Sequence, residues 1–139
     1  MKRVTGLGGV FFKTKDPSAL KEWYRLHLGV NLDPEYGTSF EWRRADDPEQ
    51  KGFTAWSPFA ADTSYFAPST KDFMVNYRVA DLEGLLGVLK AEGVKIVGEM
   101  QTFEYGKFAH VLDLEGNKVE LWEPDDKAYE AMVKGRTTF

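Results

Sequence analysis

Two stretches of the sequence, residues 7–32 (LGGVFFKTKDPSALKEWYRLHLGVNL) and residues 72–96 (DFMVNYRVADLEGLLGVLKAEGVKI), repeat the same order of structural signals. Each begins with a short run of β-branched and aromatic residues that is typical of a strand. Each continues with an aspartate, Asp16 or Asp81, that can cap a helix by accepting hydrogen bonds from its first turn. Apolar residues at helical spacing and a glycine stop follow in both. The same strand–helix unit is therefore predicted twice.

A run of expected strands follows each predicted helix, at 30–33, 38–44 and 52–58 in the first copy and at 94–100, 107–112 and 118–123 in the second. The order of elements thus agrees over both halves of the chain, as expected for an internal repeat. We divide the single domain of residues 1–139 into module one (5–60), a linker (61–72), module two (73–124), and a C-terminal helix with a tail (125–139). A short strand is expected near Tyr65, and the tail is expected to be mobile.

Composition restricts the class of protein. The 139 residues are 42% hydrophobic and 14% aromatic, which is enough for a sizeable core. The net charge is −4 and no basic stripe is present, so nucleic acid is not an expected partner. The chain has no cysteine, which excludes disulfides and thiolate metal sites. No apolar run reaches the roughly 20 residues of a membrane span. Lys13 also interrupts the N-terminal apolar run, so no signal peptide is predicted and a cytoplasmic location is expected.

Two motifs resemble those of the vicinal oxygen chelate superfamily, which includes glyoxalase I, extradiol dioxygenases and the bleomycin-resistance proteins. Residues 11–30 (FFKTKDPSALKEWYRLHLGV) are similar to the opening strand and helix of the family. Residues 111–124 (VLDLEGNKVELWEP) are similar to its closing hairpin, with Leu114 where proline is usual. The resemblance implies an α+β fold in which tandem β-α-β-β-β modules form a curled mixed sheet that encloses a cavity. It also implies a homodimer in which the partner completes each cavity, although the two modules of one chain can also enclose the cavity by themselves.

The resemblance locates four metal-ligand positions, one on the first strand and one on the last strand of each module. The first-strand positions, seven residues before the capping aspartates, are Gly9 and Met74. The last-strand positions are Glu120 and, in module one, Thr54, or Trp56 in a register two residues longer. A hard divalent ion prefers oxygen or imidazole ligands, which glycine and methionine do not offer.

Glu120 is therefore the only ligand position retained, and no metal cofactor is expected. A divalent metal is still possible in an unorthodox site made of three residues, namely His110, Glu120 and Asn76.

Alternation along the strand 73–79 places Asn76 and Arg78 on the same inward face as Met74. Buried polar groups need partners. Arg78 could form an ion pair with Glu120 while Asn76 bonds to the backbone, or both could face the carboxylate or carbonyl of a ligand. Glu120 and His110 are the candidate catalytic residues, because a buried glutamate beside a histidine suits proton transfer. Alternatively, His110 lies at the rim and Glu120 is only neutralised by Arg78.

Aromatic residues could line a flat hydrophobic cleft for a planar ligand, or belong to the ordinary core. The candidates are Phe11, Trp42, Trp56, Tyr105, Phe108 and Trp122, and Asn76 and Arg78 complete the predicted ligand-binding set.

Three functions follow from these residues. The first is a metal-independent protein that binds a small aromatic or amphipathic molecule in a two-module cup. The second, implied by the resemblance, is a glyoxalase-type lyase or isomerase that uses Glu120 as a proton shuttle, with or without a divalent metal. The third is a structural role with a vestigial cup. The first needs an open aromatic cleft, and the third needs a cup filled by its own side chains.

Overall fold

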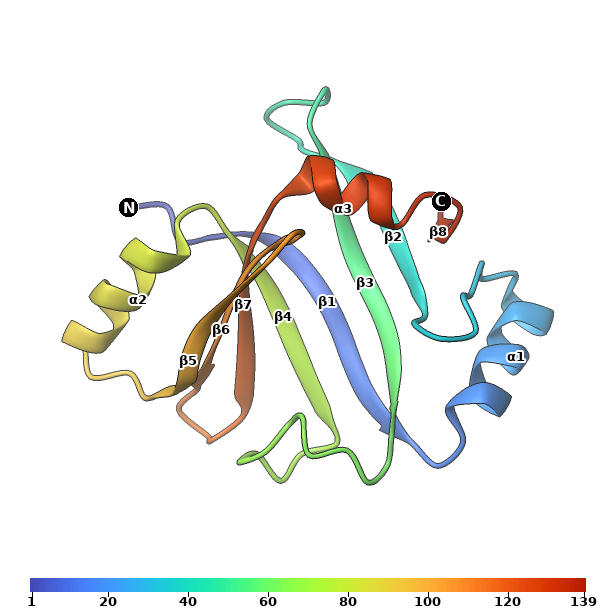
Figure 1. The fold of residues 1–139 in the computed structure, drawn as a ribbon, viewed down its shortest axis with the longest axis horizontal. Coiled ribbons are helices and arrows are strands. Elements are labelled where there is room, and N and C mark those ends of the chain that lie inside the picture. The colour runs from blue at the N-terminus through green and yellow to red at the C-terminus, as the bar shows by residue number, and fades with distance from the viewer.

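The computed structural model describes residues 1–139 as one mixed eight-stranded sheet and three helices, which confirms the predicted α+β class (Figure 1). The strand order is β5-β6-β7-β4-β1-β3-β2-β8. The strands are β1 (Val4–Thr14), β2 (Thr38–Arg43), β3 (Lys51–Ala60), β4 (Phe73–Val79), β5 (Ile96–Phe103), β6 (Gly106–Leu112), β7 (Lys118–Pro124) and β8 (Thr137–Thr138). The helices are α1 (Pro17–Leu28), α2 (Leu82–Ala91) and α3 (Asp126–Met132).

The two predicted modules are joined at the centre of the sheet, where β1 and β4 pair in antiparallel fashion. Each of these strands also pairs in parallel with the last strand of its own module, β1 with β3 and β4 with β7. Parallel neighbours need a crossover connection, and α1 and α2 provide it. These helices flank opposite ends of the sheet, while α3 crosses above the strands between them (Figure 1). None of the helices is long and apolar enough to cross a membrane.

The helix caps follow the local sequence. The side chain of Asp16 accepts a hydrogen bond from the amide of Ala19 at 3.0 Å, and Asp81 accepts one from Gly84 at the same distance. Gly29 ends α1 with a φ of 68°, a left-handed conformation that glycine adopts without steric cost. These short-range signals explain why both helices begin where the sequence predicts.

The outer edge of module one differs from the prediction. Residues 30–33 form no strand, because the side chain of Asp33 accepts hydrogen bonds from the amides of Glu35 and Tyr36 and turns the chain. The predicted mobile tail instead forms β8, which pairs in parallel with β2. Asn31 fastens this tail by donating to the carbonyls of Gly135 and Thr137. The short strand expected near Tyr65 is also wrong, since this part of the linker consists of turns.

Buried apolar side chains gather in two clusters. One joins α2 to the strands of module two, and its most buried members are Val79, Leu82, Leu85 and Ala109. The other consists of Phe53, Trp122, Tyr129 and Val133, and it joins α3 and the residue after it to the sheet. The second cluster therefore fixes the C-terminal helix over the strands of both modules.

Candidate functional site

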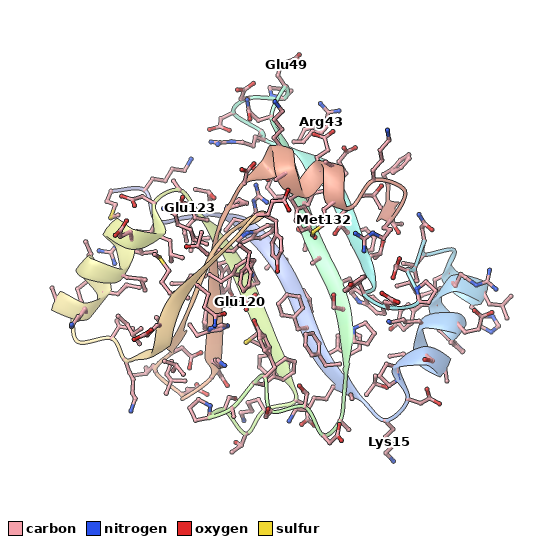
Figure 2. All side chains as sticks on the ribbon, viewed as in Figure 1. Lys15, Arg43, Glu49, Glu120, Glu123 and Met132 are labelled. Atoms are coloured by element: carbon pink, nitrogen blue, oxygen red, sulfur yellow. The ribbon has the colours of Figure 1, made fainter.

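Glu120 on β7 lies at the centre of the candidate site (Figure 2). The register of the sheet pairs Glu120 with Asn76 on β4 and with His110 on β6. Directly paired residues on neighbouring strands point to the same face of a sheet. The three predicted polar residues therefore come together because their strands are adjacent, although they are far apart in sequence.

The Glu120 side chain is 3% exposed and its two oxygens are fully engaged. Oε1 accepts a hydrogen bond from Asn76 Nδ2 at 2.7 Å. Oε2 accepts one from the hydroxyl of Tyr65 and lies 2.7 Å from His110 Nε2. Hydrogen bonds to a buried carboxylate are strong enough to hold its charge in a dry environment. The Glu120 carboxylate is therefore accommodated by the protein's own donors.

Tyr65 is the member of this cluster that sequence analysis did not predict. It belongs to the linker, where its ring stacks on Phe59 at 5.7 Å and meets the edge of His110 at 5.6 Å. Burial and the charge of Glu120 raise the pKa of Tyr65, so the phenol keeps its proton and donates a hydrogen bond to the carboxylate. Lys118 holds this part of the linker by donating from Nζ to the Tyr65 carbonyl at 2.7 Å. An aromatic residue within a polar linker is the only sequence signal for this contact.

Arg78 does not pair with Glu120. Its Nη2 atom lies 2.6 Å from both carboxylate oxygens of Asp126, at the start of α3. The reason is the register, which places Arg78 opposite Trp122, two residues beyond Glu120. Asn76, in contrast, donates a hydrogen bond to the Glu120 carboxylate. The predicted alternative in which Asn76 bonds to the backbone is therefore wrong.

The register also corrects the predicted metal position in module one. Val10 and Val75 each precede the capping aspartate of their module by six residues. Val10 pairs with Trp56 in module one, and Val75 pairs with Val119 in module two. The residue after Trp56, which is Ser57, therefore takes the place that Glu120 has in module two. Both predicted alternatives, Thr54 and Trp56, are wrong.

The residues at the family's ligand positions do not fit a divalent ion. Gly9 offers no side chain, Met74 a thioether and Ser57 a neutral hydroxyl, and no group of three His, Cys, Asp or Glu residues converges anywhere in the structure. The alternative set of Asn76, His110 and Glu120 does come together, but the Asn76 amide nitrogen points at the carboxylate instead of an oxygen. Glu120 is the only one of these residues that offers a carboxylate oxygen to a metal ion.

A half-open pocket of about 360 Å³ is lined by residues other than those of this cluster. Strands β2 and β3 contribute Ser39, Ala55 and Ser57 to its walls, while the C-terminal segment contributes Tyr129, Met132, Val133 and Arg136. Tyr36 and Tyr105 add two further aromatic rings. The Ser39 and Tyr129 hydroxyls bond to each other at 2.6 Å. Burial raises the pKa of Tyr105, and the charge of Glu120 adds to this effect. Tyr105 is therefore the pocket residue on which the charge of Glu120 acts.

Of the predicted aromatic residues, Tyr105 is the one that lines this pocket. Trp56 instead packs against Tyr24 of α1 and Phe12, away from Glu120, which corrects its expected place in the cleft. Trp122 is 2% exposed and stacks on Phe108 in the core.

Two other predicted ligand-binding residues also contact protein groups. Phe11 packs on Phe59, with ring centroids 5.6 Å apart. Trp42 donates from Nε1 to Thr54 at 2.8 Å, and its ring lies 5.2 Å from the Arg78 guanidinium.

Comparison with known proteins agrees with this architecture. The sequence model of the Glyoxalase/Bleomycin resistance protein/Dioxygenase superfamily matches residues 6–121. The chain belongs to this superfamily. No curated protein matches the glyoxalase-superfamily chain described here.

Solved structures of the superfamily fold are similar at low sequence identity. Methylmalonyl-CoA epimerase from Mycobacterium tuberculosis has a TM-score of 0.60 and 23% identity, over 91% of this chain and 92% of its own. A variant of the epimerase from Streptomyces coelicolor in complex with 2-nitronate-propionyl-CoA has a TM-score of 0.63 and 15% identity, over 88% and 99%. The Mn(II)-bound glyoxalase from Novosphingobium aromaticivorans has a TM-score of 0.58 and 14% identity, over 88% of this chain and 40% of its own. These similarities show that the chain shares its fold with these solved structures.

Proposed function

We propose that this protein binds a small aromatic or amphipathic molecule in the pocket bounded by Tyr36, Tyr105 and Tyr129. The observation that supports this function is the contrast between two neighbouring sites. The family's ligand position at Glu120 is enclosed by protein donors, whereas the pocket offers space, aromatic rings and hydroxyl groups. Tyrosine provides a large apolar contact area together with a polar tip, which suits an amphipathic ligand.

Binding of uncharged planar aromatic compounds tests this proposal. Isothermal titration calorimetry with 2-naphthamide should show binding to the wild-type protein. Tyr105→Ala removes a ring from the pocket wall and should weaken binding about tenfold, because a buried aromatic contact contributes roughly 1.5–3 kcal/mol. Trp23→Ala is the matched control, because Trp23 is a half-exposed ring on α1 outside the pocket. Equal weakening by both substitutions, or none by either, would contradict this site.

A second candidate function is an acid–base enzyme of the lyase or isomerase type, in which Glu120 moves a proton. The observation that favours it is the 2.7 Å contact between Glu120 and His110, whose side chain is 13% exposed. His110 would carry the proton between a bound substrate and the enclosed Glu120. The proposed shuttle uses the side chains of Glu120 and His110.

Deuterium exchange distinguishes this alternative from simple binding. Proton NMR in D₂O would follow exchange at the carbon beside the carbonyl of α-hydroxyketones and acyl thioesters. Glu120→Gln keeps the shape of the side chain and removes its charge, so it should slow any catalysed exchange by about 100-fold or more. Identical slow exchange with wild-type protein, variant and buffer would leave binding as the function.

We also propose that the protein forms a homodimer. Three exposed apolar residues on β1 and β2 support this proposal, since Val4, Leu7 and Phe40 are 50%, 42% and 37% exposed. Both modules of one chain already surround the cup, so the second copy would associate through an outer surface. Multi-angle light scattering should give twice the chain mass, and Leu7→Glu with Phe40→Glu should shift it to the monomer mass.

A further inference from the structure

The pocket bounded by Tyr36, Tyr105 and Tyr129 carries charge of one sign only. Of the eleven residues that line it, only Arg136 is ionisable with a charge at neutral pH, and no aspartate or glutamate is among them. A cation in a partly enclosed site attracts an anionic group more strongly than one in open water, because solvent screening is weaker there.

Arg136 has no acidic partner in the structure. Four of the six arginines form ion pairs with a carboxylate, namely Arg3, Arg25, Arg44 and Arg78. The two others are Arg43, which bonds to the Pro48 carbonyl, and Arg136, which donates from Nη2 to the Met132 carbonyl. Arg136 is therefore the arginine that combines an uncompensated charge with a place in a pocket wall.

The position of Arg136 is fixed by its backbone and by its neighbours. Its carbonyl accepts hydrogen bonds from the Ser39 amide and from the Thr38 hydroxyl, both at 3.3 Å. Its guanidinium carbon lies 5.1 Å from the ring centroid of Tyr36. Stacking on an aromatic face fixes the plane of a guanidinium, which reduces the entropy that is lost when it binds a ligand.

These observations also orient a ligand. The pocket wall carries the Arg136 guanidinium together with the aromatic rings of Tyr105 and Tyr129. An anionic group would be attracted to Arg136, and an apolar ring would remain to face Tyr105 and Tyr129. The planar fork of a guanidinium matches a carboxylate with two parallel hydrogen bonds.

Resting on the proposed binding function, we propose that the ligand is an aromatic carboxylate and that Arg136 is the residue that binds its carboxylate. Arg136 lies beyond residues 6–121, the part of the chain that matches the superfamily. The segment that follows β7 supplies four of the pocket's lining residues, namely Tyr129, Met132, Val133 and Arg136. This C-terminal segment thus adds anion selectivity to the shared fold.

Calorimetry with a matched pair of probes tests the assignment. 2-Naphthoate and 2-naphthamide have the same ring system, and only the first is charged. Wild-type protein should bind 2-naphthoate at least about tenfold more tightly, because a hydrogen bond between charged groups strengthens binding by about that factor or more. Arg136→Gln should abolish the preference, so that the two probes bind the variant with equal affinity. Arg43→Gln is the control, because Arg43 is likewise free of an acidic partner but lies by the loop between β2 and β3 (Figure 2).

The outcomes separate the inference from the proposed function. If both probes bind wild-type protein equally and Arg136→Gln changes neither, the carboxylate assignment is wrong while aromatic binding stands. If neither probe binds, the proposed aromatic site is itself wrong. If Arg136→Gln also loses the amide, Arg136→Lys decides. It keeps the charge but not the fork, so a partial preference that falls with added salt supports the assignment, and no preference overturns it.

Discussion

Modules one and two share a backbone plan but place different chemistry on the inner face of the sheet. Phe11 and Asn76 each lie five residues before the capping aspartate of their module, and Ser57 occupies the place of Glu120. Module two thus holds a hydrogen-bonded buried charge, whereas module one contributes apolar and small residues, among them Ser57 in the wall of the pocket. The comparison shows that two modules with the same pairing of strands can carry different side chains at matched positions.

The two modules also differ in how their helices are attached. Helix α2 buries Leu82 and Leu85 in the core of module two, whereas α1 exposes Trp23 and Leu26 to solvent by 50% and 65%. Burial of apolar surface is the main source of stability. Module two is therefore expected to be the more sensitive half of the molecule.

The largest predicted effect compares the truncation of a buried leucine in α2 with that of an exposed leucine in α1. Leu85→Ala removes a side chain that is 3% exposed and should lower the free energy of unfolding by about 2–5 kcal/mol. Leu26→Ala on α1 should change it by no more than about 0.5 kcal/mol, because this residue is 65% exposed. Urea unfolding of both variants measures the difference, and similar losses would remove the contrast between the modules.

The second prediction compares the matched positions on the last strands. Glu120→Ala leaves the donors of Asn76, Tyr65 and His110 without their acceptor, so it should destabilise the protein by about 1–3 kcal/mol. Ser57→Ala at the equivalent place in module one should be nearly neutral, since no hydrogen bond depends on that hydroxyl. Chemical denaturation would show whether the loss is specific to module two. A fully stable Glu120→Ala protein would contradict the buried hydrogen-bond network.

The third prediction compares the two edges of the sheet. The edge strand beside module two is its own strand β5. The edge strand beside module one is β8, from the C-terminal tail that accepts hydrogen bonds from the Asn31 side chain. Asn31→Ala should cost about 1 kcal/mol, the usual contribution of such hydrogen bonds. Hydrogen exchange should then become faster at the Ser39 amide, which donates to the Arg136 carbonyl. Gln101→Ala on β5 is the matched change, and it should leave the exchange rates of module one unaltered.

The smallest predicted effect concerns the pH dependence of the linker contact. The pKa of Tyr65 is raised in the folded protein by burial and by Glu120, so its contribution to stability is present below about pH 10 and is lost as the pH rises further. Tyr65→Phe should therefore unfold with a shallower dependence on pH above 10 than wild type. Tyr24→Phe on α1 controls for the loss of a hydroxyl. Denaturant unfolding between pH 8 and 11 provides the measurement, and equal slopes for all three proteins would refute the contact with Glu120.

Sequence analysis predicts the site only in part. Strand alternation correctly brings Asn76 and His110 toward Glu120, because these strands lie next to each other in the sheet. It does not separate Asn76 from Arg78, since both have the same parity and only the pairing register decides which one meets the carboxylate. It also places Trp56 in the cleft, although the register turns it toward α1.

The sequence by itself determined the elements that depend on neighbours in the chain: the capping aspartates, the glycine stops, the alternation of strands and the repeat. Only the tertiary structure decided that Ser57 matches Glu120, that Tyr65 closes over the carboxylate, and that Arg136 enters a pocket. These contacts join residues many positions apart, 55 between Tyr65 and Glu120 and 107 between Asn31 and Thr138. Local energies do not encode such pairs, because they form only when strand register and the path of the linker and tail have been fixed by packing of the whole sheet.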